Sequence, residues 1–380
     1  MWCLRLRNGL FRRSPIRVPC VCVGNAASGG TGKTPAVIYL VGLVHALTGD
    51  ARSVWVVARG YAHDERVLLR EVLRDAHLLV LGKNRRTAVQ RALERVAPHE
   101  HPQLLIMDDG LQHFGMSRDM NICMIDAMRP RGLNGWLLPA GSLREPIGRA
   151  AARSELIVLH NANLVSSRRI AAISRYLRRR GVCARITTSR VEVDSLMEAT
   201  PGQPHAVLRP LKEVPSLGAE VKRITRDPSA TSVTSPEDAT RVCHRMRVAL
   251  LCAIGNADAF TMLVRRCVRF CDVTFVQQFP DHHAFSAREL ESLATRCADN
   301  RCDAVLTTEK DWSRDAQGLF ETLTRVQPKS NAQPRLRVWV LKTRFAPDEP
   351  GAFRELLVQI GIRDSLAPVD TRTTDNPIVR

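Results

Sequence analysis

The feature that most constrains this 380-residue chain is a glycine-rich segment between an apolar run and a helix-like run. Residues 21–35 read VCVGNAASGGTGKTP, and a stretch with helical character follows from Pro35 to Leu47. The backbone N–H groups of such a loop can surround phosphate oxygens at the N-terminus of a helix, where the helix dipole also favours anions. The segment therefore predicts a strand, a phosphate-binding loop and a helix, in that order.

The side chains of this loop indicate a nucleotide bound with a metal ion. The Lys33 ammonium group is placed to reach the β- and γ-phosphates, and the Thr34 hydroxyl to coordinate Mg²⁺. The strict pattern has glycine where this chain has Ala27, but other glycines still supply a permissive backbone. Kinases, GTPases, ATPases and helicases all remain open at this point, although a guanine-selecting N-K-x-D sequence is absent. We predict that a nucleoside triphosphate and Mg²⁺ bind through Gly29, Gly30, Thr31, Gly32, Lys33 and Thr34.

Short apolar runs alternate with helix-like stretches along most of the chain. Such continuous runs are typical of a parallel sheet that is buried on both faces. Right-handed crossovers between them predict a doubly wound, P-loop NTPase-like α/β domain over residues 18–197, followed by a second, smaller α/β domain over residues 241–363. The runs occur at residues 18–23, 54–58, 78–81, 104–107, 122–125, 156–159, 248–253, 273–276, 304–306 and 337–341.

The remaining segments lack this pattern. Residues 1–17 form a short basic stub that could lie flat on an anionic surface as an amphipathic anchor. Residues 198–240 are polar and without periodicity, so we expect a linker or irregular segment, and we expect residues 364–380 to be a disordered tail. No run approaches the roughly 18 apolar residues of a membrane-spanning helix. The cysteines lack C-x-x-C spacing, so the sequence predicts buried thiols rather than a disulfide framework or a zinc site.

The charge balance points to a polyanionic partner. The chain has 56 Lys and Arg residues against 38 Asp and Glu residues, a net charge of +18. Nucleic acid, an anionic membrane surface or a phosphorylated substrate would each fit. However, the arginines are spread along the chain, and no basic-aromatic stripe accompanies them. General compositional bias therefore explains much of the charge, and nucleic acid is the less favoured partner.

Further motifs follow the phosphate loop in a distinctive order. They are ARGY at 58–61, MDDGLQH at 107–113, LPAGSLREP at 138–146, GN at 255–256, FPDHH at 279–283 and TEKD at 308–311. This series closely resembles the tetraacyldisaccharide 4'-kinases, the lipid A 4'-kinases of Gram-negative bacteria, over about residues 15–345. The resemblance implies transfer of the γ-phosphate of ATP to the 4'-hydroxyl of a tetraacylated glucosamine disaccharide 1-phosphate. It also implies a peripheral enzyme at an anionic membrane surface, the cytoplasmic face of the bacterial inner membrane, and we expect a monomer.

The resemblance gives catalytic roles to two adjacent acidic residues, Asp64 and Glu65. It implies that Asp64 acts as the base and that Glu65 lies near the metal. Only Ala62 and His63 separate this pair from Tyr61, where the family usually has a longer segment. A solvated acidic pair in an exposed loop is the alternative interpretation.

His282 follows Asp281 in the predicted second domain. A histidine oriented by a carboxylate is a common device for general base catalysis. The resemblance suggests that His282 couples with Asp64 across a cleft between the domains, which a hinge in the Gly- and Pro-containing connections would close. A surface turn that leads into a helix is the alternative.

Asp108 and Asp109 end an apolar run, as a carboxylate must if it faces the phosphate loop from the carboxyl edge of the sheet. The resemblance places Asp108 and Gln112 at the metal and Asp109 and His113 at the substrate. A capping Asp-Asp-Gly turn is the alternative.

Two further side chains are candidate substrate ligands. The guanidinium group of Arg144 is suited to bind a substrate phosphate in bidentate fashion. Tyr61 could stack on the adenine or the sugar. Two other functions remain open beside the kinase: a P-loop protein that acts on nucleic acid, and a family member that has lost catalysis.

Overall fold

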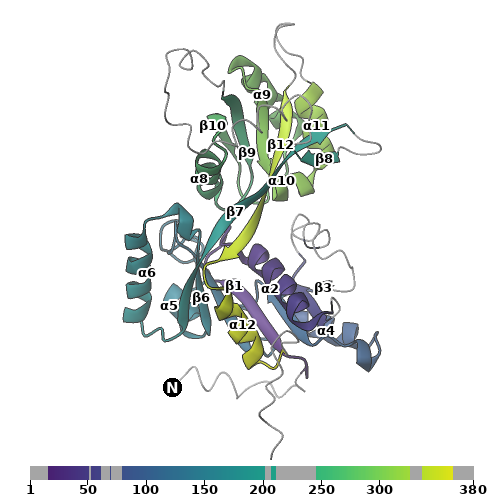
Figure 1. The fold of residues 1–380 in the computed structure, drawn as a ribbon, viewed down its shortest axis with the longest axis vertical. Coiled ribbons are helices and arrows are strands. Elements are labelled where there is room, and N and C mark those ends of the chain that lie inside the picture. Colours follow the sequence, from purple (N-terminus) through teal and green to yellow (C-terminus); the bar gives the residue numbers. More distant parts are fainter. Residues whose placement is uncertain are drawn as a thin grey trace, which may run out of the picture.

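The computed structural model describes residues 16–50, 53–60, 69, 79–201, 207–210, 245–325 and 336–362. These residues form two α/β lobes that share one extended sheet (Figure 1). The predicted fold class, a doubly wound parallel sheet with a second, smaller α/β unit, is confirmed. Tyr61, Asp64 and Glu65 lie outside the described residues, as do most of the N-terminal stub and the predicted tail.

The first lobe is built on parallel strands with β1 at the centre. The predicted apolar runs all become strands, and every residue of β1 is buried, as expected for a sheet that is covered on both faces. The order across this lobe is β6-β5-β1-β4-β2-β3. The strands are β1 (Cys20–Asn25), β2 (Val54–Ala58), β3 (Leu79–Leu81), β4 (Leu104–Asp108), β5 (Met120–Asp126) and β6 (Leu156–His160). The helices are α2 (Lys33–Thr48), α4 (Arg85–Leu93), α5 (Ile147–Ala152) and α6 (Ser167–Arg179), with 3-10 turns η3 (Pro98–Glu100) and η4 (Ala162–Leu164).

The second lobe is a three-layer sandwich whose two cores follow the strand alternation. In β9, Val248 and Leu250 face the core beneath one helix, whereas Ala249 and Leu251 face the core beneath the helices on the other side. Successive side chains of a strand point to opposite faces, so one continuous apolar run serves both layers. The strands are β9 (Met246–Cys252), β10 (Cys271–Gln278) and β11 (Ala304–Thr308). Helix α8 (Ala257–Cys267) covers one face, and α9 (Ala287–Asp299), α10 (Glu309–Arg314) and α11 (Ala316–Arg325) cover the other.

The described connection between the lobes is a pair of long antiparallel strands (Figure 1). Strand β7 (Arg185–Thr200) pairs with β6 in the first lobe and then with β12 (Arg337–Pro347), which pairs with β11 in the second. This differs from the predicted Gly- and Pro-containing connection. It also places residues 198–200 and β8 (Val207–Pro210) of the predicted linker in the sheet.

The end of the predicted second domain returns to the first lobe. Helix α12 (Pro350–Gln359) buries Phe353 and Leu357 in the first-lobe core. Its Phe353 ring lies 5.4 Å from the ring of Tyr39 on α2. The described chain therefore crosses between the lobes twice, and the predicted span of residues 241–363 is divided between both cores.

Candidate active site

The carboxyl ends of the strands in both lobes face one cleft of about 1360 Å³. Loops after β1, β4 and β6 line it from the first lobe, and loops after β9, β10 and β11 line it from the second. Ligands of open α/β sheets bind outside this edge. Every predicted site residue that the structure describes lines the cleft, namely Gly29, Gly30, Thr31, Gly32, Lys33, Thr34, Asp108, Asp109, Gln112, His113, Arg144 and His282.

The phosphate loop is held in shape at both ends. The Asn25 side-chain amide donates a 2.6 Å hydrogen bond to the Thr31 hydroxyl. Gly32 caps α2 with φ +80°, and a Cβ at this position would lie 2.5 Å from the His160 ring, so a side chain is excluded here for two reasons. The first turn of α2 carries no acidic side chain, so its N–H groups and Lys33 face the cleft without a competing carboxylate on the same turn.

Ala27 occupies the position where the strict phosphate-loop pattern has glycine. It forms a bridge with Leu143, and the N–H of Ser28 donates to the carbonyl of Ser142 at 2.7 Å. The N–H of Arg144 donates to the carbonyl of Ala26, also at 2.7 Å. This part of the loop is therefore extended backbone paired with residues 142–144, a conformation that alanine adopts as readily as most residues.

Asp108 and Asp109 leave β4 directly opposite the phosphate loop. The Thr34 hydroxyl donates to Asp108 Oδ2 at 3.2 Å. Asp109 adopts a positive φ of 50°, and Arg85 donates to the carbonyl oxygens of both aspartates at 3.0 and 2.9 Å. The buried Arg85 guanidinium thus fixes the turn that orients the two carboxylates.

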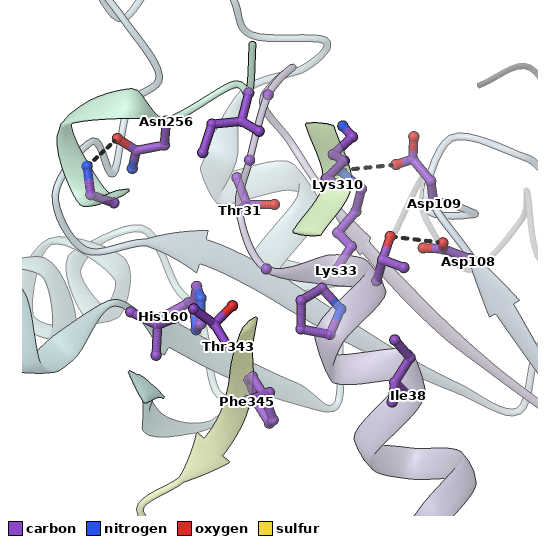
Figure 2. A pocket seen from close by; sticks show the side chains of 18 of the residues that line it. Thr31, Lys33, Ile38, Asp108, Asp109, His160, Asn256, Lys310, Thr343 and Phe345 are labelled. Atoms are coloured by element: carbon purple, nitrogen blue, oxygen red, sulfur yellow. Dashed lines mark hydrogen bonds and ion pairs between the residues drawn. The ribbon is translucent and has the colours of Figure 1, made fainter. Parts of the chain in front are cut away.

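Asp109 lies among cations. Lys33 Nζ lies 3.8 Å from its Oδ1, and Arg144 donates to both of its oxygens at 2.7 Å. Burial alone would raise the pKa of Asp109, but Lys33, Arg144 and Arg85 hold it below its ordinary value. Figure 2 shows Lys33 beside Asp109, with Asp108 next to them. The carboxylate is ionised and keeps Lys33 and Arg144 directed into the cleft.

Gln112 and His113 complete the first-lobe wall. Gln112 Nε2 donates to the carbonyl of Asn25 at 2.8 Å and to Glu145 Oε1 at 2.6 Å, so only its Oε1 is suited to a metal. Burial and the nearby cations Arg85, Arg118 and Arg59 lower the pKa of His113. Its Nε2 atom is buried without a hydrogen-bond partner among the described residues. A neutral imidazole here can accept or donate one hydrogen bond to a ligand.

The second-lobe wall presents a histidine beside a carboxylate. His282 has φ +64°, and its Nε2 lies 3.7 Å from Asp281 Oδ2. Lys310 Nζ lies 3.2 Å from the other oxygen of Asp281. His283, in contrast, stacks on Phe279 at 4.7 Å and pairs with Glu289 at 3.1 Å, so it supports the loop rather than the cleft.

Comparison with known proteins identifies the family. The profile of the tetraacyldisaccharide-1-P 4'-kinases matches residues 1–361. The chain belongs to this family. A tetraacyldisaccharide 4'-kinase from Janthinobacterium sp. (strain Marseille) is 31% identical over 93% of this chain and 85% of its own. A homologue from Anaeromyxobacter dehalogenans is 30% identical over 80% of this chain and 74% of its own. A probable mitochondrial tetraacyldisaccharide 4'-kinase from Arabidopsis thaliana is 27% identical over 83% and 78%.

A solved structure agrees with the fold. The crystal structure of LpxK from Aquifex aeolicus in complex with ATP matches with a TM-score of 0.54. It covers 94% of this chain and 93% of its own length at 19% identity. The family assignment by sequence and the shared fold therefore agree on a two-lobed P-loop kinase architecture.

Within this family member, the phosphate loop is in direct contact with the second lobe. A Cβ on Gly255 would lie 2.2 Å from the backbone nitrogen of Gly30, so only glycine allows the two backbones to approach. Next to it, Asn256 Nδ2 donates to Asp126 Oδ2 at 2.7 Å, and Asn256 Oδ1 accepts from the Ala259 N–H at 3.1 Å. Burial raises the pKa of Asp126, and a 2.9 Å hydrogen bond from Asn161 opposes this. The Asp126–Asn256 pair ties the lobes together beside the phosphate loop.

Sequence reasoning assigned no role to Arg85, Asp126, His160 or Asn256. His160 lies against Gly32, accepts from or donates to the Ser189 hydroxyl at 3.0 Å, and stacks on Phe345 at 5.7 Å. Burial lowers its pKa to about 4, so the ring is neutral. Asp126 and His160 both end strands that neighbour the phosphate loop, and the rule that found Asp108 could have found them. The contacts of Arg85 with Asp108 and Asp109 and of Asn256 with Asp126 join distant residues, so no local pattern reveals them.

Proposed function

We propose that this chain transfers the γ-phosphate of ATP to the 4'-hydroxyl of a tetraacyldisaccharide 1-phosphate. The observation that carries the proposal is the arrangement of the cleft, in a chain of the tetraacyldisaccharide-1-P 4'-kinase family. A phosphate loop with Lys33 faces two carboxylates in the first lobe, and His282 enters from the second. Phosphoryl transfer needs phosphate positioning, charge neutralisation and an oriented nucleophile, and the cleft offers groups for each.

The nucleotide phosphates bind at the start of α2. Backbone N–H groups of Gly29–Thr34 surround the phosphate oxygens, and the Lys33 ammonium neutralises charge on the β- and γ-phosphates. Asp109 holds Lys33 at 3.8 Å, a distance that leaves the ammonium able to turn to a phosphate. The neutral His160 ring supports Gly32 without adding charge to the site.

The donor atoms near the loop suit Mg²⁺. Thr34 Oγ1 and Asp108 Oδ2 are hard oxygen ligands 3.2 Å apart. Within the described residues, no group of three or more His, Cys, Asp and Glu side chains could hold a metal alone. This is the usual situation for Mg²⁺, which is held by one or two carboxylates together with substrate phosphates. Bound there, Mg²⁺ would neutralise charge on the phosphates.

The histidine of the second lobe, His282, is the candidate base for the hydroxyl group that accepts the phosphate. His282 would take the proton of the attacking 4'-hydroxyl, while Asp281, paired with Lys310, orients the ring. Asp64, the predicted base, lies outside the described residues and stays a prediction. Arg144 and His113 line the cleft from the first lobe and are suited to the negatively charged disaccharide.

We further propose that the protein works as a monomer at the cytoplasmic face of the bacterial inner membrane, as a peripheral enzyme. The net charge of +18 favours an anionic surface, and one chain supplies both walls of the cleft. No described helix has the length and apolar character needed to cross a bilayer.

The decisive test is transfer of labelled γ-phosphate from ATP to tetraacyldisaccharide 1-phosphate in mixed micelles. Lys33→Ala should lower the rate about 10²–10³-fold, the typical loss when one group that stabilises transition-state charge is removed. Lys342→Ala is the matched control, because this lysine pairs with Glu309 at 3.0 Å and does not line the cleft. Equal rates in wild type and Lys33→Ala would contradict the proposal. Absence of transfer by a wild-type protein that binds ATP would favour a family member without catalysis, and salt-dependent RNA binding would then be measured.

A further inference from the structure

A loop beside the phosphate loop exposes large apolar side chains. All residues from 133 to 140, here called the apolar loop, are exposed. Leu133, Trp136, Leu137 and Leu138 are 72, 67, 46 and 56% exposed. Isolated apolar side chains on a surface need no explanation, but a contiguous patch marks an interaction site.

Hydrogen bonds hold these side chains in the solvent. The Leu138 N–H donates to the Leu143 carbonyl at 2.8 Å, and the Leu143 N–H donates to the Trp136 carbonyl at 3.0 Å. Asn134 accepts from the Trp136 N–H at 3.1 Å and donates to the Ala140 carbonyl at 2.8 Å. The backbone of the loop is therefore fixed by hydrogen bonds, and it holds the apolar side chains exposed to solvent.

The base of the apolar loop is attached to the nucleotide site. Residues 142–144 pair with residues 26–28 of the phosphate loop through two 2.7 Å backbone hydrogen bonds. Arg144, two residues after Ser142, binds Asp109 in the cleft. A surface that holds the apolar loop would therefore hold the cleft at a fixed distance from itself.

The apolar loop lies in a segment of the chain without acidic residues. No acidic residue occurs between Ala127 and Arg144, whereas Arg129, which pairs with Asp258, and Arg131 precede the apolar loop. A further exposed ring, Phe114, lies 5.6 and 5.7 Å from the guanidinium groups of Arg118 and Arg153. Tryptophan and leucine flanked by arginine are the side chains that enter the interface of an anionic bilayer.

We propose that the apolar loop inserts Trp136, Leu137 and Leu138 into the interfacial region of an anionic lipid bilayer and so places the cleft at the membrane surface. The inference rests on the proposed function in one respect, that an acylated substrate is presented from a bilayer. An eight-residue projection is small for a protein interface, which covers about 800 Å² per partner. A few side chains are enough for shallow insertion into lipid.

Tryptophan fluorescence of the full chain tests the insertion directly. Trp55, Trp312 and Trp339 are buried, so in a Trp2→Phe background Trp136 is the exposed tryptophan. Mixing with phosphatidylcholine–phosphatidylglycerol vesicles that contain no substrate should shift its emission to shorter wavelength. Vesicles of phosphatidylcholine alone should give a smaller shift, because they carry no net negative charge to attract the basic protein. No shift with either vesicle would overturn the proposal.

Vesicle co-sedimentation tests the contribution of the loop to binding. The triple variant W136S/L137S/L138S should bind anionic vesicles at least about tenfold more weakly, because burial of each large apolar side chain is worth roughly that factor or more. The control is Val358→Ser, which removes a 49% exposed apolar side chain from α12. The single variant Leu137→Ser should give an intermediate loss and keeps the test valid if the triple variant is poorly folded. Equal binding by wild type and both loop variants would overturn the proposal.

These two readouts involve neither ATP nor phosphoryl transfer. A wild-type protein that inserts Trp136 but transfers no phosphate would leave the docking surface in place and contradict the proposed function. A kinase that is active in micelles but shows no Trp136 shift would contradict the docking surface alone.

Discussion

The two walls of the cleft are built differently. On the first-lobe wall, Lys33, Asp109 and Arg144 hold one another, and Arg85 fixes the turn beneath them. On the second-lobe wall, Asp281 pairs with Lys310, and the His282 side chain is 41% exposed against 14% for Lys33. The first wall is organised for an anion before any ligand binds. The second presents its histidine from the loop after β10.

This contrast follows from where the residues lie in the sheet. Asp108 is the last residue of β4, a central strand whose every residue is buried, and Lys33 is the first residue of helix α2, so their backbones have little freedom. His282 stands four residues after the end of β10, whose side chains are mostly half-buried. The described chain passes between the lobes through the β7–β12 pair, which has a register shift between Lys342 and Thr343. Such a pair can bend while it keeps both lobes in one sheet.

The largest difference between variants is expected at two adjacent histidines of the second wall, His282 and His283. His282→Ala should lower kcat by about 10²–10⁴, the usual contribution of a positioned base, with little change in thermal stability. His283→Ala should lower the melting temperature, because the ring loses its stack on Phe279 and its contact with Glu289. Steady-state phosphate transfer and thermal denaturation of both variants separate the two roles. A His282 variant with full kcat would show that His282 is not the base.

The sequence predicted the parts of the site that local patterns encode. The phosphate loop and the Asp108–Asp109 turn were found because a strand, a loop and a helix follow one another within a few residues. Arg85 was missed, and Asn256 was noted only as part of a motif without a role, because their contacts join residues 23 and 130 positions apart. Strand β7 was not foreseen either, since most of its side chains are half-buried and it lacks a continuous apolar run. A strand that crosses between two lobes has no single face that is buried along its whole length, so its sequence does not alternate regularly between apolar and polar residues.

A smaller effect is expected when acid protonates His160, which lies beneath the phosphate loop of the first wall: the free energy of unfolding should fall. The pKa of the buried His160 falls to about 4, from an ordinary value near 6.5 in the unfolded chain. Between these values the unfolded chain binds a proton that the folded chain does not, so stability is full above about pH 6.5 and falls as the pH drops towards 4. The shift corresponds to at most about 3 kcal/mol.

Urea denaturation between pH 7.5 and 4.5 measures this dependence. His160→Asn should lose the part of the acid slope that comes from this ring, although it will be less stable at pH 7.5 because the stack on Phe345 is lost. His99→Asn is the control, since His99 is exposed. If the free energy of unfolding of His160→Asn falls with pH as steeply as that of the wild type, protonation of His160 does not cause the loss of stability in acid.

The smallest effect is expected where the two walls are tied together. Asn256→Ala removes the cap of α8 and the bond to Asp126, whereas Ser286→Ala removes a cap from α9 in the same lobe without a cross-lobe contact. Each should cost about 1 kcal/mol of stability as a lost cap. Only Asn256→Ala should also weaken ATP binding, by a few-fold, because Gly255 and Asn256 then no longer hold the second lobe against the phosphate loop. A double-mutant cycle of Asn256→Ala with Asp126→Asn measures the coupling energy of this contact. A coupling energy near zero, together with equal ATP affinity of the Asn256 and Ser286 variants, would show that other contacts hold the two walls together.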